Sequence, residues 1–185
     1  MIMTNSLLQA THLPRFQHIQ IKDIEPAIDY LLKHNRDEIE KILKQKTFTW
    51  QTLVQTLDDE LNRAWSPVSH MNAVVNNDEL REAYQSCIGK ISDYGTEISQ
   101  NVQLYNAIKS LQEGPEYASL TVAQKKIIDN DLRDFRLSGV SLAEDKKQQY
   151  KIAQQRLTEI CNKFEENLLD ATNAWQKHIT DKNLL

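Results

Sequence analysis

Glycine and proline are scarce in this sequence, with four of each among 185 residues. An average chain carries roughly 12% of these two residues together, and this chain has well under half of that share. Glycine and proline supply most tight turns, so their scarcity argues against the frequent chain reversals of β-sandwiches, barrels and doubly wound sheets. The sequence therefore predicts long helices.

Apolar residues recur every three or four positions over roughly 35 residues near the C-terminal end, which is the period of one helix face. The positions are Tyr150, Ala153, Leu157, Ile160, Cys161, Phe164, Leu168, Ala171, Trp175 and Ile179. Shorter runs of the same period precede this one, and no repeat of fixed length links them. We therefore expect an all-α fold, an antiparallel bundle of about five to six helices that ends in one long helix.

This long stripe is expected to face inward, as are apolar positions of earlier helices. Under that hypothesis, truncation of Leu61, Leu132 or Phe164 to alanine each costs about 2–5 kcal/mol of stability.

The chain divides into an extended arm over residues 1–22, a single helical domain over 23–180 and a tail over 181–185. The arm lacks a period and should lay a few apolar side chains on the body. Asp23 is the expected N-cap of the first helix, which should run to about Lys46.

A second helix is expected to begin after Thr49 and to keep one apolar face as far as Val75. Pro67 lies inside this run and should kink the helix, because its ring clashes with the preceding turn and removes a hydrogen bond. The polar residues 76–78 end this helix and cap the third. Residues 114–115 (GP) stop a shorter fourth segment.

Two further helix starts carry the capping-box pattern, Thr121 with Gln124 and Ser141 with Glu144. Gly139 lies between them and is the natural left-handed residue after a helix C-terminus. These signals predict a helix that ends just before Gly139 and the long helix that begins near Glu144.

Charge and composition exclude several kinds of partner. The net charge is −4 and the isoelectric point is near 5.7. The basic pairs at 125–126 and 146–147 are too short for a nucleic-acid surface. We expect no secretory leader, and no apolar run reaches the roughly 20 residues that cross a bilayer. We expect neither a nucleic-acid partner nor a membrane.

The two cysteines, Cys87 and Cys161, stand alone in helical patterns. Disulfide frameworks and zinc knuckles need closer, paired spacings, so both are interpreted as small core residues in a reducing compartment. The expected location is the cytoplasm.

The five histidines offer no metal site: His12, His18, His34, His70 and His178. None belongs to His-Glu-x-x-His, and none follows a glutamate by three residues, so zincin and di-iron motifs are both absent.

Residues 66–70 (SPVSH) place hydroxyls beside an imidazole, but a nucleophile also needs a base that a third group orients. Asp129 and Arg133 are four residues apart and are interpreted as a surface ion pair, not as part of a calcium-binding loop. Residues 165–166 (EE) are interpreted as a solvated helix face. No catalytic and no metal-binding residue is therefore assigned, and the substrate-binding residues are unknown.

Four stretches are more particular than a generic helical bundle. They are residues 66–72 (SPVSHMN), 80–84 (LREAY), 124–126 (QKK) with 131–140 (DLRDFRLSGV), and 164–172 (FEENLLDAT). In order and interval they resemble the N-terminal region of the thimet oligopeptidase family of zinc metallopeptidases. The resemblance extends from Leu7 to Thr180.

The resemblance implies a longer, mostly helical protein whose two lobes flank a channel that admits short peptides. In that family one zinc ion is held by the histidines of His-Glu-x-x-His and a downstream glutamate, all C-terminal to the region matched here. The chain is then expected to be a non-catalytic N-terminal fragment that helps to wall the channel, and its partner is the missing catalytic region. A free-standing helical interaction module is the alternative.

The end of the chain carries a separate expectation. Trp175 and Ile179 should continue the stripe of the long helix and meet residues that are absent here. The exposed patch would then promote self-association through that helix, or Leu184 and Leu185 would fold back onto the bundle. A frayed tail is the remaining possibility.

Overall fold

The computed structural model describes residues 5–9, 13–54, 59–75 and 77–180. Within them the chain is helical and has no strand, so the predicted all-α class is confirmed. The α-helices are α1 (Ile24–Leu43), α2 (Trp50–Leu53), α3 (Asp59–Val74), α4 (Asp78–Ser99), α5 (Val102–Glu113), α6 (Val122–Leu137) and α7 (Glu144–Ala174). Short 3₁₀ turns are η2 (Ser6–Leu8), η3 (Phe16–His18), η4 (Ile21–Asp23) and η5 (Pro115–Ser119).

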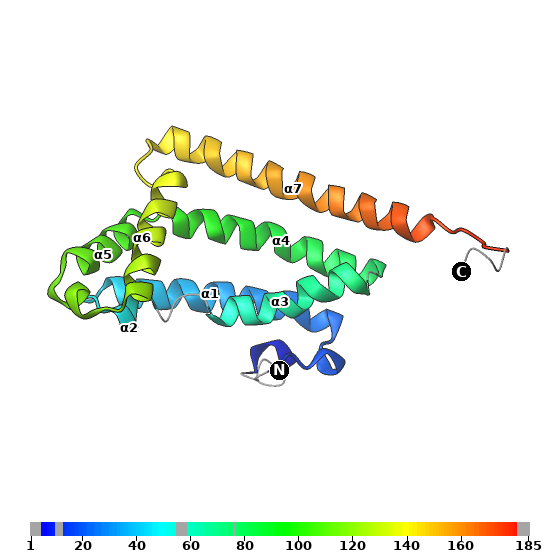
Figure 1. The fold of residues 1–185 in the computed structure, drawn as a ribbon, viewed down its shortest axis with the longest axis horizontal. Coiled ribbons are helices and arrows are strands. Elements are labelled where there is room, and N and C mark those ends of the chain that lie inside the picture. Colours follow the sequence, from blue (N-terminus) through cyan, green and yellow to red (C-terminus); the bar gives the residue numbers. More distant parts are fainter. Residues whose placement is uncertain (1–4, 10–12, 55–58, 76, 181–185) are drawn as a thin grey trace.

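Successive long helices, α1, α3, α4 and α7, run in alternating directions and are stacked (Figure 1). Helices α1 and α3 lie together on one side of α4, and α7 lies along the other side of α4. Helices α2, α5 and α6 gather at one end, where α6 crosses the direction of the long helices. In the described part of the chain, α7 therefore forms an outer layer that rests mainly on α4.

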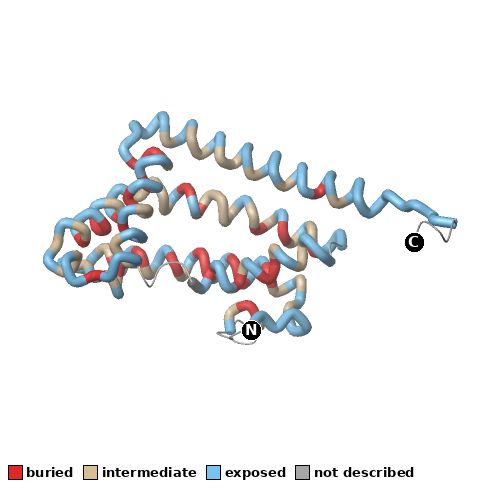
Figure 2. The backbone as a smooth tube through the Cα atoms, viewed as in Figure 1, coloured by how far each residue is buried: buried red, intermediate tan, exposed pale blue. Residues whose placement is uncertain are grey.

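Two apolar clusters form the core. The first joins α1, α3 and α4 and is centred on fully buried Ile24, Ile28, Val68 and Leu80. The second lies at the end formed by α2, α5 and α6 and includes the buried side chains of Leu53, Leu104, Ile128, Leu132, Phe135 and Val140. Both clusters come from the apolar faces of α1 to α6, and α7 contributes to neither (Figure 2).

The N-terminal arm is held by polar contacts. The Asn5 side chain accepts a hydrogen bond from the Leu7 N–H at 3.0 Å and donates one to the Asp23 carbonyl at 2.8 Å. Ser6 donates to the His18 carbonyl at 2.9 Å. These contacts bring η2 against α1 and α3, where Leu7 is buried.

Most of the predicted helix boundaries are confirmed. Asn77 caps α4, because its side chain accepts a hydrogen bond from the Leu80 N–H at 2.8 Å. Gly139 has φ of 79°. The Val140 N–H donates to the Phe135 carbonyl and the Gly139 N–H to that of Arg136, the two bonds of a Schellman motif.

The second predicted helix differs from the structure. It is divided into α2 and α3, and the segment between them, 55–58, lies outside the described residues. Helix α3 continues through Pro67, whose predicted kink stays a prediction. Helix α1 ends at Leu43 and not at Lys46, and Asp23 precedes it without a side-chain capping bond because η4 leads directly into α1. Asn76 also lies outside the described residues.

The second capping box is wrong. Ser141 lies in the turn that follows the Schellman motif, and α7 is preceded by Ala143, which makes no side-chain cap. The Thr121 box is confirmed, with reciprocal bonds of 3.3 Å and 2.9 Å between Thr121 and Gln124.

This contrast gives a matched test of capping. Thr121→Ala should lower the free energy of unfolding by about 1 kcal/mol, because one helix N–H loses its acceptor. Ser141→Ala should change the free energy by less than about 0.5 kcal/mol, as a surface substitution does. Urea unfolding followed by circular dichroism measures both, and equal losses for the two variants would contradict the assignment.

The inward stripe predicted for the last helix is also wrong. Leu157, Ile160, Phe164 and Leu168 are 51–66% exposed, and Cys161 is exposed as well. The helix ends at Ala174, so Trp175 and Ile179 do not continue it. None of the described helices combines the length and the hydropathy that a membrane span needs.

Candidate functional site

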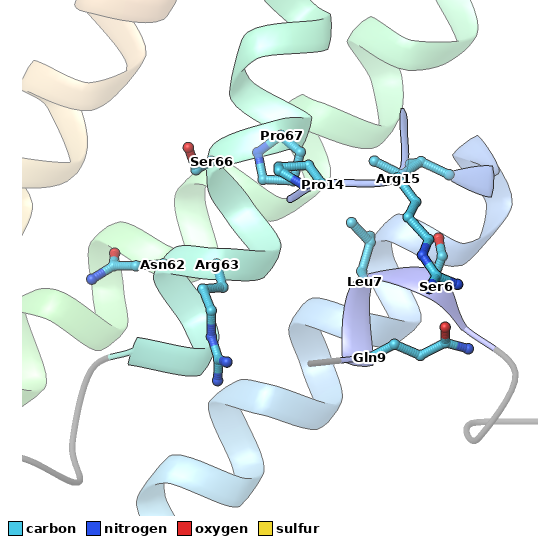
Figure 3. Close-up of a pocket in the computed structure, with 10 residues that line it drawn as sticks. Ser6, Leu7, Gln9, Pro14, Arg15, Asn62, Arg63, Ser66 and Pro67 are labelled. Carbon is cyan, nitrogen blue, oxygen red and sulfur yellow. The ribbon is translucent and has the colours of Figure 1, made fainter. Parts of the chain in front are cut away.

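A small cavity lies between the N-terminal arm and α3 (Figure 3). Its volume is about 310 Å³, and Leu7, Pro14, Arg15, Ser66 and Pro67 are among the residues around it. Arginines are the only ionisable side chains among its described lining residues, which include no acid, histidine or cysteine. The cavity therefore lacks the acid–base pair that catalysis of bond cleavage needs.

The hydroxyls and imidazole of residues 66–70 do not form a catalytic arrangement. Ser66 borders the cavity, whereas the exposed ring of His70 packs against Phe16 with ring centroids 5.6 Å apart. Ser69 is bonded instead to the hydroxyl of the buried Tyr84. Burial raises the pKa of Tyr84, and the Ser69 bond acts in the opposite direction. Ser69 and His70 therefore each contact a residue outside this segment, and neither is paired with the other for catalysis.

The histidines stay apart. His18 and His178 are exposed, and His34 stacks on Tyr30 with centroids 5.9 Å apart. His12 lies outside the described residues. Among the described residues no three His, Cys, Asp or Glu side chains come together as a metal site would require. The residues present do not fit the zinc that the family resemblance implies for a longer protein.

The expected surface pair of Asp129 and Arg133 does not form. Asp129 accepts a hydrogen bond from Gln112 at 2.8 Å, which joins α6 to α5. Arg133 pairs with Asp134 at 2.8 Å. Asp129 of α6 therefore bonds to a neighbouring helix, whereas the (i, i+4) rule considers only contacts within one helix.

The face of α7 that touches α4 is polar, and Glu166 is its most buried acidic residue. Only 7% of Glu166 is exposed, so the prediction of a solvated face at residues 165–166 is wrong for Glu166, whereas Glu165 is exposed as predicted. Its carboxylate accepts hydrogen bonds from Gln85 of α4, from Asn162 at 3.2 Å and from Lys163 at 3.3 Å. Burial raises the pKa of Glu166, but bonds from Gln85 and Lys163 outweigh it, and the pKa is lower than its ordinary value.

Further polar contacts follow the same face in both directions. Arg81 of α4 holds Asp170 with two bonds, of 2.8 Å and 3.3 Å. The Arg81 hydrogen bond lowers the pKa of the Asp170 carboxyl. Toward the other end, the Ser92 and Thr158 hydroxyls are 2.9 Å apart and Gln155 donates to Asp93 at 2.7 Å.

We call this set of contacts between α4 and α7 the polar clasp. It consists of Arg81, Gln85, Ser92 and Asp93 of α4 with Gln155, Thr158, Asn162, Lys163, Glu166 and Asp170 of α7. A groove of about 580 Å³ runs along it beside Gly89, where a Cβ atom would meet nothing within 4 Å. The groove offers hydrogen-bonding amides, hydroxyls and carboxylates but no thiol or imidazole among its described lining residues, so it suits polar recognition and not nucleophilic catalysis.

A different side of α7 carries the exposed apolar residues, which we call the outer stripe: Ala153, Leu157, Ile160, Cys161, Phe164, Leu168 and Ala171. With 3.6 residues per turn, the centre of this stripe lies about 170° around the helix from the polar clasp. Helix α7 therefore contacts the bundle mainly through polar groups and presents its apolar side to solvent.

Sequence reasoning missed the polar clasp, although its signal is present. Arg81, Gln85 and Ser92 recur at helical spacing on α4, and Gln155, Thr158, Asn162 and Glu166 do so on α7. These positions form a second, polar stripe on each of the two helices. The usual rule that apolar faces point inward led to the apolar stripe being chosen as the buried side instead.

The sequence was compared with known families. The pattern described as Neurolysin/Thimet oligopeptidase, N-terminal domain, matches residues 28–147, from within α1 to the first turn of α7. This match covers more than half of the chain and confirms the resemblance seen in residues 66–72 and 131–140.

Individual relatives align with nearly the whole chain. Oligopeptidase A from Haemophilus influenzae is 46% identical over 185 residues, which are 98% of this chain and 27% of that protein. Oligopeptidase A from Escherichia coli is 44% identical over 97% of this chain and 27% of that protein. Arabidopsis thaliana has a relative named probable cytosolic oligopeptidase A, 32% identical over 98% of this chain and 26% of that protein.

The chain thus spans about a quarter of the length of the curated relatives it matches. Its helical fold, the match over residues 28–147 and the collinear likeness to oligopeptidase A agree with one another. The chain belongs to the neurolysin/thimet oligopeptidase family and corresponds to its N-terminal domain.

Proposed function

We propose that this chain is the non-catalytic N-terminal region of a cytosolic zinc oligopeptidase that degrades short peptides. The observation that carries the proposal is the alignment of 98% of the chain, at 46% identity, with only 27% of oligopeptidase A from Haemophilus influenzae. Such a match supports the view that this chain is a colinear part of a longer peptidase.

The chemistry of the chain agrees with a supporting role. The sequence contains no His-Glu-x-x-His, and its described residues gather no metal-binding set. Zinc, in this proposal, is bound and used by the following part of the longer protein, where it would activate water for attack on a peptide carbonyl. In this proposal the residues of this chain bind no zinc.

The role we assign to the helices is to wall the channel that admits peptide. The stacked long helices form an extended layer (Figure 1), and the groove along the polar clasp offers peptide-like hydrogen-bonding partners. A rigid wall restricts substrates by size, since a folded protein cannot enter a narrow channel. A cytosolic location is supported by the name of one Arabidopsis thaliana relative.

A free-standing interaction module is the second candidate, favoured by one observation. The outer stripe is an exposed apolar surface on a chain that has two cores of its own. Exposed apolar surfaces of this kind bind other proteins.

A chimera tests the first candidate. Residues 1–185 replace the matching N-terminal 27% of oligopeptidase A from Haemophilus influenzae. The chimera should cleave a fluorogenic peptide of about eight residues with kcat/KM within about tenfold of the parent enzyme, a loss of no more than about 1.4 kcal/mol. It should bind one zinc ion and leave casein largely intact.

The isolated chain is the control and should show no cleavage and no stoichiometric zinc by metal analysis. A chimera that is folded by circular dichroism and monodisperse, yet cleaves the peptide no faster than the isolated chain, would refute the proposed function.

A further inference from the structure

Helix α7 has a polar side that is covered and an apolar side that is not. Glu166 is 7% exposed in the polar clasp, whereas Phe164, two residues away, is 66% exposed. A helix at the surface of a finished globular protein has the opposite arrangement, with its apolar side inward. The exposed side of α7 therefore has the composition of a helix face that is normally buried.

The outer stripe is large enough to bind a further element of structure. From Ala153 to Ala171 it extends over 18 residue steps, or about 27 Å at 1.5 Å per residue. Leu157, Ile160 and Leu168 are each more than half exposed along this length. A partner helix of about five turns would cover it.

The position of α7 in the family match indicates what covers the stripe. The N-terminal domain pattern ends at residue 147, so all but the first turn of α7 lies beyond it. Relatives that align with 98% of this chain have about three-quarters of their length outside the alignment. Helix α7 thus lies at the junction between the N-terminal domain and the remainder of the longer protein.

We propose that the outer stripe is the surface on which the polypeptide C-terminal to residue 185 packs, through apolar side chains of a helix. In the complete protein α7 is then an interior helix, joined to α4 by the polar clasp and to the following domain by the outer stripe. This inference rests on the proposed function only in that both require a longer protein.

A second copy of the chain fits the stripe less well. Arg156 and Lys163 border the stripe on one side, and both side chains are more than two-thirds exposed. An antiparallel pair of α7 helices centred on the stripe brings the same border of each copy together and places Lys163 close to Lys163 of the second copy, which opposes like charges. A helix of different sequence does not have this constraint.

Cys161 provides a direct probe, because it is an exposed thiol in the outer stripe, whereas Cys87 is buried. The probe is N-ethylmaleimide, with labelling at each cysteine followed by peptide mass spectrometry. The isolated chain is compared with the chimera described above. Ile152→Cys is the matched control, since Ile152 is 56% exposed on the same helix but lies off the stripe.

Labelling of Cys161 should be at least about tenfold slower in the chimera than in the isolated chain, because local opening must precede reaction. Labelling of Ile152→Cys should be the same in both. Equal labelling of Cys161 in both proteins would overturn the proposal. Protection of Cys161 in the isolated chain that disappears on dilution would also overturn it, since a second copy would then be the occupant.

A charge-introducing variant provides a second, independent measurement. Phe164→Glu with Leu168→Glu should leave the melting temperature of the isolated chain nearly unchanged, because both side chains are exposed there. In the chimera it should lower the melting temperature and restore Cys161 labelling. An unchanged chimera would contradict the proposal.

Peptidase activity separates this inference from the proposed function. An inactive chimera with a protected Cys161 refutes the function and supports the packing. An active chimera with a fully reactive Cys161 supports the function and refutes the packing.

Discussion

Leu132→Ala and Leu61→Ala should each lower the free energy of unfolding by about 2–5 kcal/mol. Leu132 is 4% exposed in the cluster at the α5–α6 end, and Leu61 is 5% exposed in the cluster of α1, α3 and α4. Truncation leaves a cavity that close-packed neighbours fill only in part. Each variant thus probes one of the two cores.

Phe164→Ala is the control for these substitutions. The sequence pattern alone predicts the same loss there, but a side chain that is 66% exposed should lose less than about 1 kcal/mol. Urea unfolding of all three variants measures the contrast. A loss at Phe164 as large as that at Leu132 would mean that α7 packs with its apolar side against the bundle.

Glu166→Ala should weaken the attachment of α7 to α4 by about 1–2 kcal/mol at pH 7. The substitution removes the acceptor shared by Gln85, Asn162 and Lys163. Because the described clasp is made of polar side chains, little apolar burial compensates for the loss. Hydrogen exchange of the α7 amides measures the effect, with Glu165→Ala as the control since Glu165 is exposed.

The same residue gives a dependence on pH with a definite sign. The pKa of Glu166 lies below its ordinary value of 4.5: burial raises it, and the bonds from Gln85 and Lys163 lower it by more. A carboxyl whose pKa is lowered by folding stabilises the native state above its unfolded pKa and loses that contribution as the pH falls through the native pKa.

The stability difference between the wild type and Glu166→Gln should therefore be present at pH 7 and disappear below pH 4.5, once Glu166 is protonated in the native state. Hydrogen exchange or urea unfolding at pH 7 and at low pH tests this. A difference that grows as the pH falls would contradict the assigned sign.

Local sequence determined most of the helix boundaries. Thr121 with Gln124, Asn77 and Gly139 act through contacts within a few residues, so their roles could be inferred without knowledge of the fold. Ser141 has the same local pattern as Thr121, yet Ser141 lies in the turn after Gly139 and does not cap a helix. The surrounding turn and the tertiary structure therefore decide which of two identical local patterns forms a capping box.

The apolar period of residues 150–171 correctly predicted a long helix and an apolar side, because both depend only on 3.6 residues per turn. Which side faces the bundle was decided by the tertiary structure. Helix α4 presents Arg81, Gln85 and Asp93 toward α7, so α7 turns its matching polar residues, among them Glu166, to that surface. The periodicity of a sequence shows which residues share one side of a helix. Which element packs against that side depends on the tertiary structure of the whole protein.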